Sequence, residues 1–354
     1  MKILATLLRY DYGIKSRGIS VERETFFPAL KSAAEIVIPF WLEDNGYPDD
    51  IEELQNRILR AVDFESPDLV FMVLMTDEIR MKTLDMISKK TRVMNWFCDD
   101  QWRFDSYSKD VAAHITDIAT VDKYSISKYV KLGFNTYYVQ WGIAHYNSNL
   151  EKAPRQYRYD ISFVGQWNMV RDWQIGFLED AGFKVECFGT GWPNGKVTSS
   201  EMEEIFRLSK INLNLSNSEP SDYRYHKYLR NRLVNRICNI RWNPIDYLRH
   251  IKRAWWDLRN PSLKNVEQIK ARNFEIPGAG GFQLSNFGPG IEDYYIPGKE
   301  IALYSGVDDL IRQIDYYQTH EKERLTIMQA GYLRSEQYQY SNILNRLLTE
   351  LFSC

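Results

Sequence analysis

Short apolar runs alternate with segments of helical periodicity through the first half of the chain. Short runs bounded by polar residues predict buried strands, and apolar residues that recur every three or four positions predict helices. The expected strands lie at residues 3–8, 36–41, 68–74, 92–97, 118–121 and 136–141, and the expected helices at 48–61, 76–89 and 127–132. Strands that alternate with helices in this way form a parallel sheet covered by helices.

The same alternation resumes after a polar segment, residues 145–158, which we interpret as a linker. The second half predicts strands at 160–164, 184–188 and 211–215 and helices at 170–181 and 200–208. We therefore expect two Rossmann-like α/β domains in tandem, residues 1–150 and 155–335, with a cleft between them. An alternative is a pair of unrelated α/β domains that share no cleft.

A basic segment at residues 221–260 interrupts the second domain. It contains eight Arg, two Lys, three Asp and no Glu, for a net charge of +7, and its apolar residues recur at helical spacing. We expect a helical insertion between the strand at 211–215 and a helix that carries Glu267. Two interpretations remain open: the insertion packs on its own domain, or it contacts an anionic membrane or an anionic acceptor as a peripheral surface.

Composition narrows the class of protein. The 354 residues suffice for two domains, and 44% hydrophobic with 26% charged residues is typical of a soluble globular protein. The net charge of −2 excludes the global basic field of a nucleic-acid-binding protein, and no apolar run is long enough to span a membrane. The first residues lack the length and cleavage site of a signal peptide, so we expect a buried strand there.

Cysteine and histidine positions bear on redox setting and metal binding. The four cysteines have no paired spacing, and the five histidines form no pair four residues apart. We therefore expect no disulfide framework, no metal site and a reducing, cytoplasmic setting.

A glycine-rich stretch with flanking carboxylates follows the insertion. Residues 272–304 read RNFEIPGAGGFQLSNFGPGIEDYYIPGKEIALY, and Glu267 and Glu275 are separated by seven residues. Turns, short strands and acids in this order are typical of a ligand crevice at the carboxyl edge of a parallel sheet. Carboxylates at such an edge suit ribose or sugar hydroxyl groups, because they accept two hydrogen bonds from a vicinal diol.

This stretch resembles the nucleotide-sugar half of GT-B glycosyltransferases of the retaining family-four type, and is most similar to the CgeB-like, spore-maturation branch. The resemblance covers most of residues 160–335. It implies that Glu275 binds the donor ribose and that Glu267 contacts the transferred sugar as a catalytic residue. Lys270 and Arg272 then add positive charge near the diphosphate, although Gln268 begins a departure from the Gly-Phe-Gly of many relatives.

Further donor-binding residues are implied by the same resemblance. Gly165 ends a strand and is followed six residues later by Arg171, a spacing similar to a diphosphate site in the family. Gly189 ends the next strand, near the expected base. The last donor-side candidates are Gly280 and Gly281, which follow Glu275.

The first domain is expected to bind the acceptor. Its first strand ends in a loop from Gly13 to Gly18, and its fourth strand ends at Asp99 and Asp100, followed by Arg103. Acids beside aromatic residues suit the binding of sugar hydroxyl groups and the stacking of sugar rings. Asp100 is the catalytic candidate. Helix capping by Asp99 or Asp100 is the alternative.

Together these features predict a GT-B glycosyltransferase of the hexosyltransferase kind that acts in bacterial cell-surface or other glycan biosynthesis. Its donor would be a nucleoside diphosphate sugar, its acceptor a saccharide, a lipid-linked group or a protein, and it would need no cofactor. The resemblance implies retention of configuration and a C-terminal helix, residues 336–354, that crosses back to the first domain. Two alternatives are a GT-B sugar-nucleotide epimerase and a non-catalytic sugar- or nucleotide-binding protein.

Overall fold

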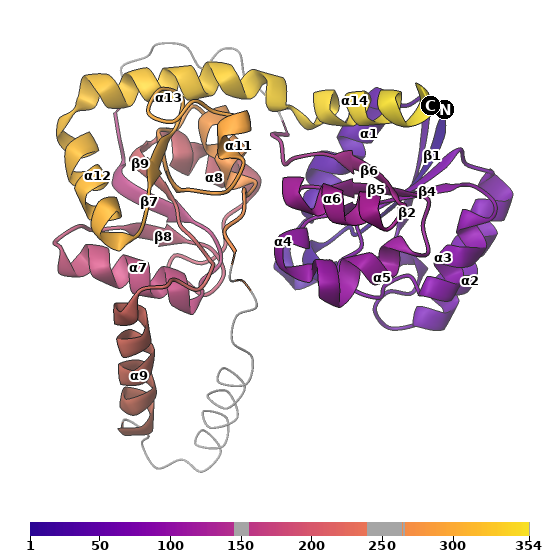
Figure 1. Cartoon of the computed structure of the whole chain (residues 1–354), viewed down its shortest axis with the longest axis horizontal. Helices are drawn as coiled ribbons and strands as arrows, with labels where there is room; N and C mark the ends of the chain where they lie inside the picture. The colour runs from indigo at the N-terminus through magenta and orange to yellow at the C-terminus, as the bar shows by residue number, and fades with distance from the viewer. Residues whose placement is uncertain (145–155, 239–263, 265, 354) are drawn as a thin grey trace. The chain divides into compact units, whose positions relative to one another are not determined.

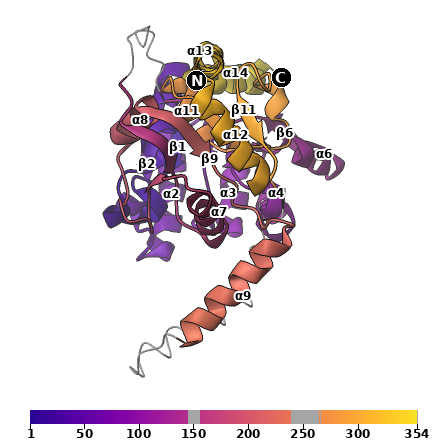
Figure 2. The same cartoon turned by 90° about the vertical axis from the view of Figure 1, so that its left-hand side faces the viewer.

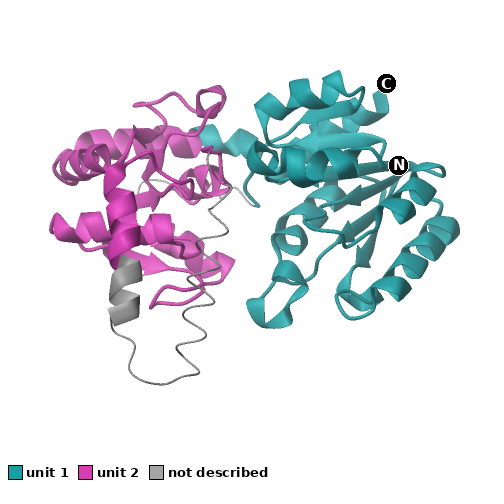
Figure 3. Ribbon diagram, turned by 60° about the horizontal axis from the view of Figure 1, so that its bottom comes forward, with its two compact units in different colours: residues 1–148, 334–354 teal, residues 149–333 magenta. Residues whose placement is uncertain are grey.

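The computed structural model describes residues 1–144, 156–238, 264 and 266–353, with side chains of α9 described only through residue 231. The chain divides into two compact units, one of residues 1–148 and 334–354 and one of residues 149–333 (Figure 3). Each unit is built on its own parallel sheet, which confirms the predicted pair of α/β units. Most of the expected linker, residues 145–158, lies outside the described residues.

The first unit contains a six-stranded sheet in which every neighbouring pair of strands is parallel (Figure 1). The strand order is β2-β1-β3-β4-β5-β6, so the direction of winding reverses at β1. The strands are β1 (Lys2–Leu7), β2 (Ile36–Trp41), β3 (Leu69–Met72), β4 (Arg92–Phe97), β5 (Asp117–Thr120) and β6 (Asn135–Tyr138).

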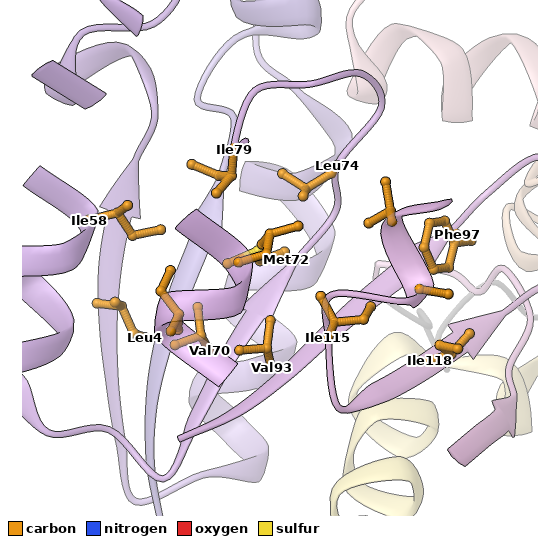
Figure 4. Close-up of a cluster of buried hydrophobic side chains, with 14 of the residues drawn as sticks. Leu4, Ile58, Val70, Met72, Leu74, Ile79, Val93, Phe97, Ile115 and Ile118 are labelled. Atoms are coloured by element: carbon orange, nitrogen blue, oxygen red, sulfur yellow. The ribbon is translucent and has the colours of Figure 1, made fainter. Parts of the chain in front are cut away.

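Helices cover both faces of this sheet. One face forms an apolar core with α2, part of which, including Ile58, is shown in Figure 4. In α2, Leu54, Ile58 and Val62 recur every four residues and are buried. The helix begins where the Asp50 side chain accepts a hydrogen bond from Glu53 N at 2.9 Å. The helices are α1 (Phe27–Ala33), α2 (Ile51–Glu65), α3 (Met81–Ser88), α4 (Asp100–Arg103), α5 (Lys109–Ala112) and α6 (Lys123–Lys131).

The last helix, α14 (Tyr340–Ser353), belongs to the first unit although 185 residues of the other unit precede it in the chain. Its residues Ile343, Leu344, Leu347, Leu348 and Leu351 are buried at helical spacing. They join Leu30 of α1 and the apolar side chains of β1, β3 and β4 in the second core of the sheet. The first unit is therefore completed by residues from the far end of the sequence.

The second unit contains a five-stranded parallel sheet in the order β11-β10-β9-β7-β8. Its strands are β7 (Tyr159–Val164), β8 (Glu186–Phe188), β9 (Ser209–Asn214), β10 (Gln283–Asn286) and β11 (Ala302–Tyr304). Its helices are α7 (Met169–Asp180), α8 (Ser199–Arg207), α9 (Tyr223–Cys238), α11 (Arg272–Gly278), α12 (Val307–Thr319) and α13 (Glu321–Ser335). Winding reverses at β7, as it does at β1 in the first unit.

The expected insertion, residues 221–260, begins as helix α9, which projects from the body of the second unit (Figures 1 and 2). Most of the remaining insertion lies outside the described residues. One expectation about its end is wrong: Glu267 lies in an irregular segment, and the next helix begins five residues later at Arg272. Among the described residues, no helix combines the length and the apolar character needed to cross a membrane.

Candidate functional site

The carboxyl edge of the second sheet brings together most of the predicted donor-side residues. In a doubly wound sheet, ligands bind outside the carboxyl ends of the strands, where the order of winding reverses. Here that point lies between β7 and β9. The loops that follow β7, β9 and β10 meet there with the segment before α11.

Glu267 is held by side chains from the ends of two strands. Its Oε1 accepts a hydrogen bond from Ser216 Oγ, and its Oε2 accepts one from Asn286 Nδ2 at 2.8 Å. Ser218 Oγ donates to the carbonyl oxygen of Val266 at 2.8 Å, which fixes the backbone beside Glu267. The carboxylate is therefore positioned at the carboxyl ends of β9 and β10.

The Lys270 ammonium lies next to this carboxylate. Its Nζ donates to Leu215 O at 3.3 Å and to Asn286 Oδ1 at 3.2 Å. Burial lowers the pKa of Lys270 to about 7; Glu267 opposes this shift, and the charge of Arg171 adds to it. Asn286 thus joins the two groups through opposite ends of its amide, and an anionic ligand would restore the charge of Lys270.

Arg171 occupies the first turn of α7, directly after the switch-point strand. Its Nη1 donates to Gln166 O at 2.7 Å, while its buried Nε has no hydrogen-bond partner in the described part of the chain. Burial, and then the positive charge of Arg272, lowers the pKa of Arg171 to about 10. A partly buried guanidinium beside a second cation is stabilised when an anion binds between them.

Close backbone approach explains two of the predicted glycines. A Cβ on Gly165 would lie 2.7 Å from the Phe163 ring and 3.4 Å from Arg171 Nη1. Gly189 has a φ of 125°, and a Cβ there would lie 2.3 Å from Gly165 O. The loops after β7 and β8 therefore touch through their glycines, and a side chain at either position would collide with a neighbouring group.

Glu275 and Arg272 form an ion pair in the first turn of α11. Arg272 Nη1 donates to Glu275 Oε2, and the two side chains are 28% and 23% exposed. Arg272 Nε also donates to Val164 O, the last residue of β7, at 3.1 Å. This bond ties the start of α11 to the switch-point strand and presents Glu275 at the same edge of the sheet as Arg171.

A cavity of about 660 Å³ opens beside these groups. Glu267, Asn286 and Ser216 form one part of its wall, and the first turn of α9 with Phe287 forms another. This volume lies within the range of small-molecule sites, about 300–1,000 Å³. Because Asn286 also accepts a hydrogen bond from Lys270, the Lys270 ammonium adjoins the wall of the cavity.

The predicted role of Gly280 and Gly281 in donor binding does not fit the structure. Both residues precede β10, so they lie at the amino edge of the parallel sheet, opposite the candidate site. Gly280 has a φ of 68°, and a Cβ on Gly281 would lie 2.7 Å from Asn212 Nδ2. These glycines instead allow the chain to leave α11 and enter β10 against β9.

In the first unit, Gly13, Gly18 and Asp99 lie in loops at the carboxyl edge of the sheet. Gly13 and Gly18 have φ angles of 71° and 89° in the loop after β1. Burial raises the pKa of Tyr12, and the charges of Asp11 and Asp99 raise it further, which places the loops after β1 and β4 side by side. Asp99 makes no side-chain capping bond to α4, so the helix-capping alternative does not apply to it.

Asp100 is instead an internal residue. It is fully buried, and its Oδ2 accepts hydrogen bonds from Thr120 Oγ1 at 2.6 Å and Tyr129 OH at 2.9 Å. Burial raises the pKa of its carboxyl group. The predicted catalytic role does not fit a side chain without exposed surface, whereas a link between α4, β5 and α6 does. Arg103, the remaining candidate, packs its guanidinium 4.2 Å from the centre of the Tyr107 ring.

Two site residues escaped the sequence prediction. Ser216 lies two residues after the end of β9, Asn286 ends β10, and both hold Glu267. Their one sequence signal is position, since each stands at the carboxyl end of a short apolar strand. Among the described residues, no group of three His, Cys, Asp or Glu side chains could hold a metal ion.

Comparison with known proteins identifies the family. A family model described as glycosyl transferase-like matches residues 171–349, half of the chain. The chain belongs to this family. A search of curated proteins returns no significant match to this glycosyl transferase-like protein.

Solved structures share its fold over nearly the whole chain. HepE of Anabaena, in complex with UDP-glucose, has a TM-score of 0.59 at 11% identity and covers 100% of this chain and 99% of its own. A glycosyltransferase from Rickettsia africae has a TM-score of 0.59 at 9% identity, covering 99% and 98%. The lipopolysaccharide outer core galactosyltransferase WaaB has a TM-score of 0.54 at 12% identity, covering 99% of both chains. At these identities the likeness establishes the fold, which is GT-B as predicted.

Proposed function

We propose that this protein transfers a sugar from a nucleoside diphosphate sugar to a saccharide, lipid-linked or protein acceptor. One observation carries the proposal: three cationic side chains and a fixed carboxylate, Glu267, surround the switch point of the second sheet beside a ligand-sized cavity. A donor of this kind has a diphosphate for the cations and sugar hydroxyl groups for the carboxylate.

The diphosphate would bind among Arg171, Lys270 and Arg272. Burial and mutual repulsion weaken the charged forms of Arg171 and Lys270 in the free protein, so an anion between them gains both contacts. The same side chains would stabilise the charge that develops on the departing diphosphate. With these cations in that role we propose a metal-independent reaction.

Glu275 would accept hydrogen bonds from the donor ribose, and Glu267 from the transferred sugar. Arg272 orients Glu275 through their ion pair, and Ser216 and Asn286 orient Glu267. Glu267 is already engaged by two donors, so we assign it sugar binding and not nucleophilic attack. Front-face attack with the diphosphate as the base, and retention of configuration, complete the proposed mechanism.

The acceptor would be bound by the loops after β1 and β4 of the first unit, through Asp99 and Arg103. Gly13 and Gly18 give the first of these loops its path. Asp100 has no catalytic role in this proposal, because it is buried.

We further propose membership of the CgeB-like branch and a bacterial, cytoplasmic role in glycan biosynthesis. The Glu-x7-Glu spacing and the glycine-rich segment after it support the branch. The described cysteines Cys98 and Cys187 are free thiols, which fits a reducing compartment.

The decisive test is nucleotide binding by a Glu275→Ala variant. Calorimetry with UDP, GDP and dTDP should identify a preferred nucleotide for the wild-type protein, and the variant should bind it about tenfold more weakly, equivalent to about 1.4 kcal/mol. The matched control is Glu179→Ala, which removes an exposed carboxylate near the C-terminal end of α7. Equal affinity in both variants would contradict the assignment of Glu275.

Turnover then separates the transferase from the epimerase alternative. A transferase consumes the sugar nucleotide only as an acceptor is glycosylated, whereas an epimerase changes the sugar with no acceptor present. Conversion of the sugar on the intact nucleotide, followed by NMR without acceptor, would therefore contradict the proposed reaction.

A further inference from the structure

The first turn of α9 is part of the cavity wall, not only the base of an insertion. Residues 220–224 line the cavity together with Glu267 and Phe287, which are far from them in the sequence. The helix that projects from the unit thus begins at the candidate site (Figure 1).

This turn is fixed by a network of ion pairs. Arg224 Nη2 donates to Asp222 Oδ2 at 2.6 Å and to Asp308 Oδ2 at 2.7 Å, and its Nη1 donates to Asp308 Oδ1 at 2.9 Å. The guanidinium also lies 5.0 Å from the centre of the Phe177 ring. One arginine therefore ties the start of α9 to the first turn of α12 and to α7.

Two neighbouring tyrosines in this turn have opposite surroundings. Tyr225 is buried, and its ring centre lies 5.4 Å from that of Trp173 on α7. Tyr223 is 77% exposed although it lines the cavity, and Phe287 on the same wall is 42% exposed. Tyr225 thus anchors the helix, whereas the exposed rings of Tyr223 and Phe287 leave apolar faces open to a ligand.

Exposed aromatic rings beside polar groups suit a sugar ring. A pyranose presents C–H groups on its faces, which pack on an aromatic ring, and hydroxyl groups around its edge, which need hydrogen-bond acceptors. The same cavity wall supplies the Glu267 carboxylate and the Asn286 amide. The diphosphate-binding cations proposed above adjoin this wall through Lys270, which places the sugar end of a donor in the cavity.

We infer that Tyr223 and Phe287 form an aromatic subsite for the transferred sugar of the donor, and that the first turn of α9 selects that sugar. The inference rests on the proposed function and adds to it the residues that recognise the glycosyl group.

Calorimetry on the full chain tests the subsite through the contribution of the sugar to binding. Affinities for UDP, GDP and dTDP are compared with those for the corresponding glucose and galactose derivatives. For the derivative that the wild type prefers, Tyr223→Ala and Phe287→Ala should each bind about tenfold more weakly, about 1.4 kcal/mol, with nucleoside diphosphate affinity unchanged. Tyr223→Phe, which keeps the ring, should bind like wild type, and Phe64→Ala, an exposed change on α2, controls for loss of an aromatic side chain.

The outcomes separate the inference from the proposal beneath it. If both alanine variants keep the wild-type ratio of affinities for the sugar nucleotide and the nucleoside diphosphate, the aromatic subsite alone would be overturned. A raised KM for acceptor, with unchanged binding of the sugar nucleotide, would likewise overturn its assignment to the donor. Absence of all nucleotide binding by the wild type would overturn the proposed function and this inference together.

Discussion

At the scale of single residues, Asn286 has a central place in the candidate site. Its amide oxygen accepts a hydrogen bond from the Lys270 ammonium, and its amide nitrogen donates to the Glu267 carboxylate. An amide between two opposite charges orients both without neutralising either. Each charged group therefore keeps capacity for a ligand, the ammonium for phosphate and the carboxylate for hydroxyl groups.

The lowered pKa of Lys270 predicts that nucleotide binding weakens above neutral pH. With a pKa of about 7, Lys270 is charged in the free protein at pH 6 and mostly neutral at pH 8, so binding at high pH requires uptake of a proton. Affinity for UDP should then fall by up to about tenfold per pH unit above pH 7. Calorimetry from pH 6 to pH 9 measures this slope.

A Lys270→Met variant is the control for that slope. It should bind UDP more weakly at pH 6 and lose the pH dependence. Between pH 7 and about 10, Lys270 of the wild type is protonated in the unfolded state and mostly neutral in the folded state. The free energy of unfolding of the wild type should therefore rise with pH over this range. The Lys270→Met variant should lack this rise. A wild-type affinity that stays flat or improves with pH would contradict the prediction.

Sequence reasoning found much of this site because its charged residues carry chemistry in a recognisable spacing. Arg171, Lys270, Glu267 and Glu275 were all named, and all lie at the carboxyl edge of the second sheet. The burial of Asp100 could not be predicted from the sequence, because its hydrogen-bond partners lie 20 and 29 residues away in the chain.

At the scale of elements, dense apolar strands were predicted best. Residues 36–41 and 92–97 coincide with β2 and β4, because both are rich in bulky apolar residues of high strand propensity. Those of β4 are buried in the sheet, whereas β2 is an edge strand in which Phe40 is buried and Ile36 is exposed. The π-helical turns Glu22–Phe26 and Phe104–Ser108 had no signal, since one extra residue per turn leaves no repeating pattern. The expected helix at Glu267 was wrong because the glutamate instead bonds to the ends of strands.

The packing of helix α14 predicts that truncating one of its buried side chains strongly lowers the stability of the first unit. Leu344 is fully buried in the core that α14 shares with α1, so Leu344→Ala should lower the free energy of unfolding of the first unit by about 2–5 kcal/mol. Urea unfolding measures the change. Arg346→Ala, at an exposed position of the same helix, should change it by less than about 0.5 kcal/mol. Equal stability of the two variants would contradict the packing of α14.

At the scale of the whole molecule, the two units repeat one topology. Each sheet is parallel, and each reverses its winding at its first strand. The residues assigned to the donor all belong to residues 149–333, and those assigned to the acceptor to the other unit. In the proposed function, each substrate therefore binds at the edge of a different sheet.

This division predicts that the second unit binds nucleotide by itself. A fragment of residues 149–333 should fold and bind UDP within about threefold of the full chain, a difference below about 0.7 kcal/mol, since no donor-side residue lies outside it. Circular dichroism establishes folding, and calorimetry measures affinity. The same fragment with Glu275→Ala provides the control, and a folded fragment that fails to bind any nucleotide of the wild type would contradict the prediction.

The return of α14 to the first unit has a consequence for synthesis on the ribosome. Residues 1–148 emerge first, yet the part of one sheet face that α14 covers stays open until residues 334–354 follow. Translation of the 185 residues between them takes roughly 10–40 s at about 5–20 residues per second. During that interval the nascent chain exposes an apolar surface that attracts chaperones. The unit that is made first is therefore the one that finishes folding last.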